Sequence, residues 1–228
     1  TRKTANYLDV SYSFGSFNTH KASINGAYTN GKTGLTTRLT SFLNYSDNNY
    51  KVYVPIIDLE SGQKLGNQWV KRFHDGYKSL RVRLETGFVN RPFADYLLAG
   101  IIVAGNDKDI QNGVVMELVY GARTTDSRSV IPMLRYKKSD LFIEGWGLSF
   151  YGSYSDVDNN STDTVPRRYN WQGEWVPNAS TSSGERSRSQ LHINNKEWRT
   201  NTSLNYTFNQ YHTLSLNHVY SGLTRKVS

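Results

Sequence analysis

Apolar and polar residues alternate with a period of two over long stretches of this sequence. Between residues 7 and 14, Leu8, Val10, Tyr12 and Phe14 alternate with Asp9, Ser11 and Ser13. The same alternation recurs in residues 22–29, 35–45, 80–88, 198–208 and 214–220. A helical period of 3.6 residues would scatter these apolar residues around an axis. The pattern therefore predicts an all-β fold, with strands that have one apolar and one polar face.

Two kinds of all-β protein contain strands of this type. In a soluble sandwich, the apolar faces of two sheets pack against each other. In an outer-membrane barrel, the apolar face contacts lipid and the polar face lines the lumen. A mean hydropathy of −0.62 is compatible with both, because only alternate residues of a barrel strand are apolar.

Three details favour the barrel. The predicted strands run for about ten residues, whereas soluble strands average about five or six. The middles of the apolar faces carry almost no charge, while the opposite faces hold Asp9, Arg38, Arg81, Arg83 and Glu85. Aromatic residues gather at the strand ends, as in interfacial girdles: Phe14, Tyr45, Phe88, Tyr96, Tyr206, Phe208 and Tyr220. Glu144 alternates in register with Phe142 and Trp146, so we expect it near a rim.

The lengths of the connections show a second regularity. Short connections are predicted at 15–20, 30–34, 90–95, 137–140 and 209–211, and long ones at 46–76, 106–129 and 155–190. If the first strand runs outward from the periplasm, all three long connections are external, as is typical of outer-membrane barrels. This assigns residues 114–120 to an external loop and leaves nine spanning strands. Single-chain bacterial barrels have an even number of strands, so we expect the sequence to be part of a longer protein.

Residues 96–103 are apolar on both faces. Leu97, Ala99, Ile101 and Val103 lie on one face, and Leu98, Gly100, Ile102 and Ala104 on the other. A strand of this kind needs cover on both sides. Either a domain that plugs a barrel or the interior of a soluble sheet would supply it.

Residues suited to catalysis or metal binding are few and poorly spaced. The sequence has no Cys, and its histidines (His20, His74, His192, His212 and His218) show no His-x-His or His-x-x-x-His spacing. There is no Gly-x-Ser-x-Gly nucleophile elbow. The net charge of +8 is distributed over loops and polar faces rather than gathered in one stripe. We therefore expect no enzyme, no metal site, no cofactor and no nucleic-acid partner.

Several short segments resemble parts of one protein family. They are Thr1-Arg2-Lys3, Ser13-Phe14-Gly15-Ser16-Phe17-Asn18-Thr19, Asn44-Tyr45-Ser46-Asp47-Asn48-Asn49-Tyr50, residues 69–75, residues 106–113, Arg168-Tyr169-Asn170-Trp171 and residues 206–221. In this order they resemble the barrel of a TonB-dependent outer-membrane receptor, over essentially all of residues 1–228. The first segment resembles the end of the family's plug domain, and the second its first hairpin.

The resemblance implies a fold and an activity. The fold would be an antiparallel up-and-down transmembrane β-barrel, present in part, with about nine spanning strands and long external loops. The protein would lie in the cell outer membrane and import a scarce nutrient (a siderophore, haem, a vitamin or a glycan) with energy from the TonB complex. The family's plug with its TonB box and the later strands are not in this sequence. We therefore expect that this chain alone neither inserts nor transports.

The resemblance also directs attention to two groups of residues. Candidates for ligand contact in the external loops are Trp69, Arg72, His74, Arg167, Arg168, Tyr169, Trp171 and Trp175. Arginines beside large aromatic rings suit sugars, chelates or carboxylates. For any single residue the favoured alternative is that the aromatics pack the loops together and the arginines bind lipopolysaccharide phosphates. Candidates for facing the lumen and plug are Arg38, Arg81, Arg83 and Glu85. The expected partners are the nutrient ligand, outer-membrane lipid and lipopolysaccharide, and the TonB complex; a soluble β-rich carbohydrate-binding module is the alternative.

Overall fold

The computed structural model describes residues 6–179 and 183–228, and it is all-β. Strand accounts for 71% of the described residues, and these contain no helix. The long strands are β1 (Tyr7–Gly15), β2 (Thr19–Thr29), β3 (Leu35–Ser46), β6 (Tyr77–Arg91), β7 (Ala94–Asp109), β8 (Thr124–Ser139), β9 (Trp146–Asp163), β12 (Ser189–Asn209) and β13 (His212–Val227). The short ones are β4 (Lys51–Ile57), β5 (Lys64–Lys71), β10 (Arg167–Tyr169) and β11 (Trp175–Pro177). The segment Thr1-Arg2-Lys3 lies outside the described residues.

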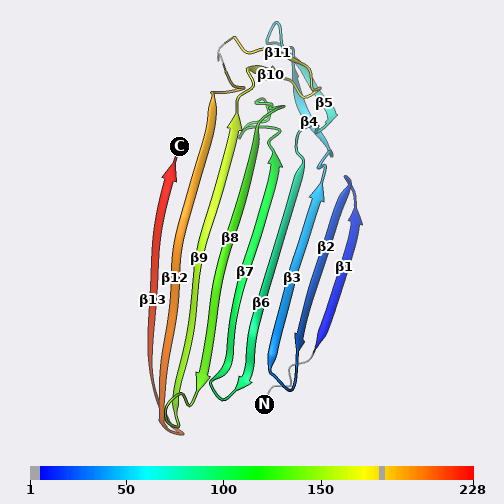
Figure 1. Cartoon of the computed structure of the whole chain (residues 1–228). Helices are drawn as coiled ribbons and strands as arrows, with labels where there is room; N and C mark the ends of the chain where they lie inside the picture. Colours follow the sequence, from blue (N-terminus) through cyan, green and yellow to red (C-terminus); the bar gives the residue numbers. More distant parts are fainter. Residues whose placement is uncertain (1–5, 180–182) are drawn as a thin grey trace.

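The long strands form one antiparallel, nine-stranded sheet in the order β1-β2-β3-β6-β7-β8-β9-β12-β13, and each strand pairs with its neighbours along the chain (Figure 1). The prediction of nine up-and-down strands is confirmed. Residues 114–120 lie between β7 and β8, as predicted for a loop segment. Among the described residues β1 and β13 do not pair with each other, so the sheet has two edges and no closed barrel is formed. The hairpins β4–β5 and β10–β11 lie within two of the long connections.

The register places every predicted apolar set on the same face of the sheet. Leu8 pairs with Gly26, Gly26 with Leu39, Leu39 with Leu84, and Leu84 with Ile101. Residues that pair across two strands point to the same face of the sheet. These five residues, and every second residue from them along each strand, therefore define the apolar face. We call the central residues of this face the apolar band. On each strand they are the first residue of a range and every second residue after it, and the ranges are 8–14, 20–28, 35–45, 80–88, 97–103, 130–136, 146–154, 198–208 and 214–220. None of these residues is Asp, Glu, Lys or Arg.

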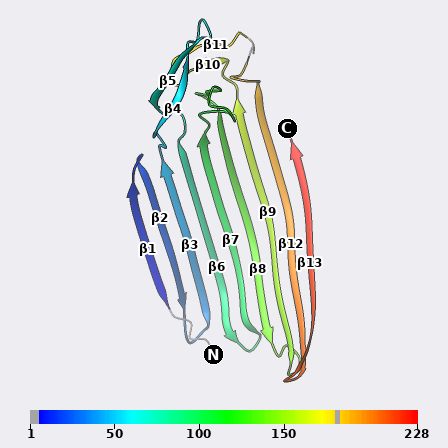
Figure 2. The ribbon, with the colours of Figure 1, turned by 180° about the vertical axis from the view of Figure 1, so that it is seen from behind.

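The nine-stranded sheet is a single layer, and nothing among the described residues packs over its apolar face (Figures 1 and 2). Leu8 is 70% exposed, Leu216 66%, and Leu84, in the middle of the sheet, 42%. A cluster of buried apolar side chains lies instead beyond the sheet, in the long connections. The sheet therefore has backbone pairing but no second layer of the kind that forms a soluble sandwich core.

Some predicted boundaries were wrong. The turn predicted at 137–140 lies at 140–145, because β8 keeps its pairing with β9 as far as Ser139 and Gly147. Asp140 then adopts a positive φ of 52°, and Glu144 lies in this turn rather than in a strand. The predicted loops 106–129 and 155–190 shrink to 110–123 and 164–188. The strands that flank these loops are longer than predicted. In their added residues both faces are polar, so the alternation of apolar and polar residues disappears although the backbone hydrogen bonds between strands continue.

Two features of β7 also differ from expectation. Tyr96 was predicted for an aromatic girdle, but it pairs with Lys137 and lies on the polar face. Leu98 and Ile102, the apolar residues on that face, are only 1% and 8% exposed without a second layer. Their neighbours in register are Arg135 and Arg83, whose long side chains lie beside them. Cover for this strand therefore comes from within the same sheet.

Candidate functional site

The long connections 47–76, 110–123 and 164–188 gather at one end of the sheet, opposite most of the short turns (Figure 1). We call their described residues the loop platform. Each connection contributes to one apolar core, made of Val54, Ile56, Val119 and Trp171. Trp171 is 2% exposed, and its Nε1 donates a hydrogen bond to the carbonyl of Met116 at 2.6 Å. The platform is therefore one packed unit rather than three independent loops.

Arg72 ties the end of the β4–β5 hairpin to the rest of the platform. Its Nε lies 3.0 Å from Asp75 Oδ2, and its Nη2 donates to Asn112 Oδ1 at 2.7 Å. The guanidinium also lies 5.7 Å from the centre of the Trp171 ring, a cation–π distance. Its side chain is 10% exposed, so the contacts of Arg72 are internal to the platform.

Gln111 makes a second internal link, which the sequence analysis did not single out. Its side chain is 1% exposed. The Oε1 atom accepts hydrogen bonds from the backbone N–H groups of Phe73 and His74, both at 2.7 Å, and Nε2 donates to the carbonyl of Tyr120 at 3.1 Å. His74 in turn donates from Nε2 to the carbonyl of Arg123 at 2.8 Å. A single glutamine in a polar segment gives no sequence signal for such a role.

The predicted ligand-contact residues divide into internal and surface positions. Arg72, His74, Tyr169 and Trp171 belong to the interior or its margin. Trp69 is 67% exposed and lies against Tyr53, with ring centres 5.4 Å apart. Arg167 places its guanidinium 3.9 Å from the centre of the Trp175 ring, and Arg168 donates to the carbonyl of Leu59. A ligand outside the platform can reach the exposed residues Trp69, Arg168 and Trp175, and in part Arg167, which is half-buried.

A half-buried glutamate, Glu185, lies at the end of β9, where its backbone N–H donates a hydrogen bond to Asp163 Oδ1 at 2.6 Å. Glu185 Oε1 accepts hydrogen bonds from the backbone N–H groups of Gly121 and Ala122, at 2.8 and 2.9 Å. Its other oxygen is enclosed and has no hydrogen-bond partner within the described part of the chain. Burial raises the pKa of Glu185, and this effect exceeds the opposing effect of the two N–H donors.

Glu185→Gln is expected to remove a pH dependence from the platform. A carboxyl whose pKa is raised on folding stabilises the folded state below its unfolded pKa, and this contribution is lost as the pH rises through the folded pKa. The free energy of local opening at Gly121 and Ala122, measured by hydrogen exchange, should therefore fall as the pH rises above about 4.5 in the parent protein. The variant should lack this component, whereas Glu60→Gln at the exposed hairpin tip should keep it. Identical pH profiles for parent and Glu185→Gln would contradict the assignment.

The predicted lumen-facing residues Arg38, Arg81, Arg83 and Glu85 all lie on the polar face. Glu85 is 5% exposed, with Arg83 Nη2 at 2.9 Å and Arg135 Nη1 at 3.6 Å from its Oε1. Gly100 makes room for this carboxylate, because a Cβ there would lie 2.7 Å from Glu85 Cγ. Arg135 was missed from the sequence, although it alternates with Leu134 and Tyr136 as a polar-face residue should.

A pocket of about 490 Å³ lies on the polar face beside this ion-pair cluster. It extends from β6 to β13, and the residues that line it include Arg83, Tyr96, Arg135, Tyr151, Asn201 and Ser203. The Arg135 guanidinium lies 5.7 Å from the centre of the Tyr96 ring. Because residues from β6 to β13 line one pocket, the polar face is concave over these strands.

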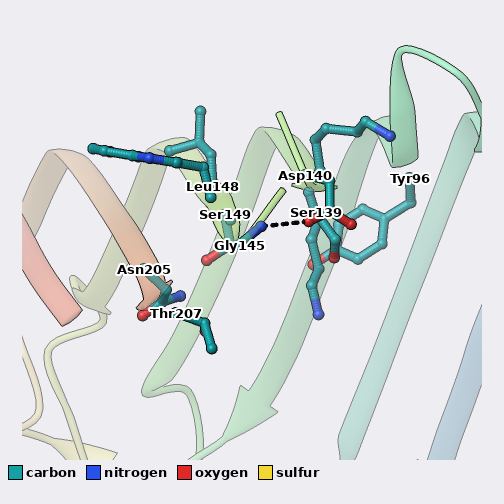
Figure 3. Close-up of a pocket in the computed structure, with 12 residues that line it drawn as sticks. Tyr96, Ser139, Asp140, Gly145, Leu148, Ser149, Asn205 and Thr207 are labelled. Carbon is teal, nitrogen blue, oxygen red and sulfur yellow. Dashed lines mark hydrogen bonds between the residues drawn. The ribbon is translucent and has the colours of Figure 1, made fainter. Parts of the chain in front are cut away.

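A second pocket, of about 460 Å³, lies next to the first toward the short turns (Figure 3). Tyr96 and Ser149 line both pockets. The turn that borders it is held by Asp140, whose Oδ1 accepts a hydrogen bond from the N–H of Gly145 at 2.8 Å. Together the two pockets form a polar hollow along β7, β8, β9 and β12.

Compared with models of known protein families and with curated proteins, the chain gives no match. Within residues 6–179 and 183–228 no helix is long and apolar enough to cross a membrane.

Proposed function

We propose that this chain forms part of the wall and the external loops of an outer-membrane active transporter of the TonB-dependent receptor type. The transporter binds a scarce nutrient, such as a siderophore, haem, a vitamin or a glycan, and imports it. The observation that carries the proposal is the apolar band, which is free of charged residues over nine strands and lies uncovered. Soluble monomers rarely expose a continuous apolar patch larger than a few hundred Å².

The height of the band supports a lipid contact. On β12 it runs from Trp198 to Phe208, about 34 Å along the strand. At the tilt of about 40° typical of outer-membrane strands, this corresponds to about 26 Å across the membrane. Aromatic residues stand at both ends of this strand's band, Trp198 at one and Tyr206 and Phe208 at the other. These values match the apolar belt and aromatic girdles of outer-membrane barrels.

Among the described residues the sheet has two edge strands, β1 and β13, each unpaired on one side, and these distinguish the membrane protein from the soluble module. Within a bilayer each free edge, at β1 and at β13, requires a further strand, because unpaired backbone groups are costly in hydrocarbon. The soluble carbohydrate-binding module requires instead a second layer over Leu39, Leu84 and Leu204. The uncovered state of this face favours the membrane protein.

The remaining parts of the proposal extend the resemblance to the receptor family. The ligand approaches from the external side, where Trp69, Arg168 and Trp175 are exposed on the loop platform. Arg72, His74, Tyr169 and Trp171 hold that surface in place. Lipid and lipopolysaccharide surround the band, and the TonB complex supplies energy through a plug in the lumen.

Spin labelling of four consecutive residues of β12 tests the membrane contact. Thr200 and Thr202 lie on the apolar face and Asn201 and Ser203 on the polar face, although all four are polar by sequence. The chain has no cysteine, so each single-cysteine variant adds one thiol to it. Labels at Thr200 and Thr202 in the membrane-inserted full protein should be several-fold more accessible to oxygen, which partitions into lipid, than labels at the other two. Equal accessibility at all four positions would sink the proposal.

A further inference from the structure

The polar face carries a strong excess of positive charge. Apart from residues at strand ends, its basic side chains are Lys21, Arg38, Arg81, Arg83, Lys108, Arg135, Lys137, Arg199 and Arg225. Its acidic side chains are Asp9, Glu85 and Glu197. The apolar band has no charge to balance this excess. The contents of the hollow therefore lie in a positive field, which favours an anion.

The ion-pair cluster leaves part of this charge unpaired beside the pocket. One buried carboxylate, Glu85, contacts both Arg83 and Arg135, so the three groups together carry one net positive charge. Arg83 contacts Glu85 through Nη2, and its Nε has no hydrogen-bond partner within the described part of the chain. Neither Arg38 nor Arg81 has an acidic partner within 4.0 Å among the described residues. A singly charged anion would complete the cluster.

The other residues of the pocket favour a hydroxylated ligand. Asn201, Asn217 and Ser203 present amide and hydroxyl groups, which donate and accept hydrogen bonds as sugar hydroxyls do. Tyr96 and Tyr151 add aromatic rings with polar tips. The volume of about 490 Å³ lies in the range of small-molecule sites.

We propose that this pocket binds a carboxylated sugar, a uronic acid unit of an acidic glycan, as cargo of the transporter. The inference rests on the proposed function, in which the polar face encloses the channel, and it specifies the chemistry of the substrate. The carboxylate pairs with Arg135 and Arg83, because guanidinium groups bind carboxylates through charge-assisted hydrogen bonds. The sugar hydroxyls bond to Asn201 and Ser203.

Calorimetric titration of the full protein, purified in detergent, tests the assignment. The probes are an oligogalacturonate and a neutral galacto-oligosaccharide of the same length. The acidic probe should bind at least about tenfold more tightly, since charge-assisted pairs are roughly twice as strong as neutral hydrogen bonds. Arg135→Gln should weaken binding of the acidic probe about tenfold and leave the neutral probe unchanged. Arg225→Gln removes the same charge from the same face outside the pocket, and it should change either affinity less than twofold.

Three results would overturn the inference: equal binding of the two probes, equal effects of Arg135→Gln and Arg225→Gln, or no binding by protein whose spin labels report insertion. The last result would leave the proposed function standing. An Asp- and Glu-rich peptide that binds more tightly than the oligogalacturonate would assign the pocket to an acidic protein segment instead. Should Arg135→Gln fail to fold, salt provides the test on the parent protein. Added salt should weaken binding of the acidic probe several-fold and spare the neutral one, and equal sensitivity would refute the charge pairing.

Discussion

On the proposal that the apolar band contacts lipid, Leu204→Arg is expected to destabilise the protein by about 2–4 kcal/mol, the cost of arginine near the middle of a barrel's lipid face. Leu204 lies near the centre of the apolar band on β12, and its partners in register are Leu148 and Leu216. A guanidinium at this position would have to enter hydrocarbon or draw water and headgroups toward it. Urea unfolding of the full protein in phosphatidylcholine vesicles measures the change.

Asn205→Arg is the matched control for this prediction. Asn205 is the next residue along the strand, and it faces the opposite side, between Gly147 and Ser215. The same side chain is introduced there into the polar hollow, so the change in the free energy of unfolding should stay below about 1 kcal/mol. If the two variants lose stability equally, the apolar face is not in contact with lipid.

Trp171→Ala is expected to lower the stability of the loop platform by about 3–5 kcal/mol, the usual cost of truncating a buried tryptophan. Trp171 is among the largest fully buried side chains, and its indole N–H bonds to the carbonyl of Met116. Its loss leaves a cavity among the three connections and frees an internal carbonyl. The effect should be confined to the platform, because the sheet strands are held by their own backbone ladder.

Native-state proteolysis of the full protein provides the measurement. Cleavage within residues 47–76, 110–123 and 164–188 should accelerate at least about a hundredfold in Trp171→Ala, while the strands stay resistant. Trp175→Ala removes the same side chain from a position that is 47% exposed, and cleavage should change less than about fivefold. Equal cleavage of the two variants would show that the core of the platform does not depend on Trp171.

The strands and their faces were predictable because a strand has a simple period. Alternation at Leu8, Leu39, Leu84 and Leu204 identifies the apolar face, whatever each strand pairs with. The predicted ends of the strands were wrong where this alternation of apolar and polar residues disappears. Beyond the band both faces of β9 are polar, so its extension to Asp163 depends on backbone pairing with β8 and β12 and on hydrogen bonds between polar side chains, such as Asn160 Nδ2 to Asp126 Oδ2.

The candidate site was less predictable than the sheet. Trp69 and Trp171 look alike in sequence, since both are tryptophans in polar loops, yet one is 67% and the other 2% exposed. Arg83 and Arg135 lie far apart along the chain and meet only because β6, β7 and β8 are neighbours and Glu85 lies between them. No local pattern encodes such a meeting.

The sequence by itself determined that this chain forms long antiparallel strands with one apolar and one polar face, because the side-chain period of a strand is a local property. Only the tertiary structure decided which loop residues are buried, how the platform closes around Trp171, and where the arginines of the polar face converge. These features depend on contacts between segments distant in sequence, and their energies are set by burial and distance rather than by residue type.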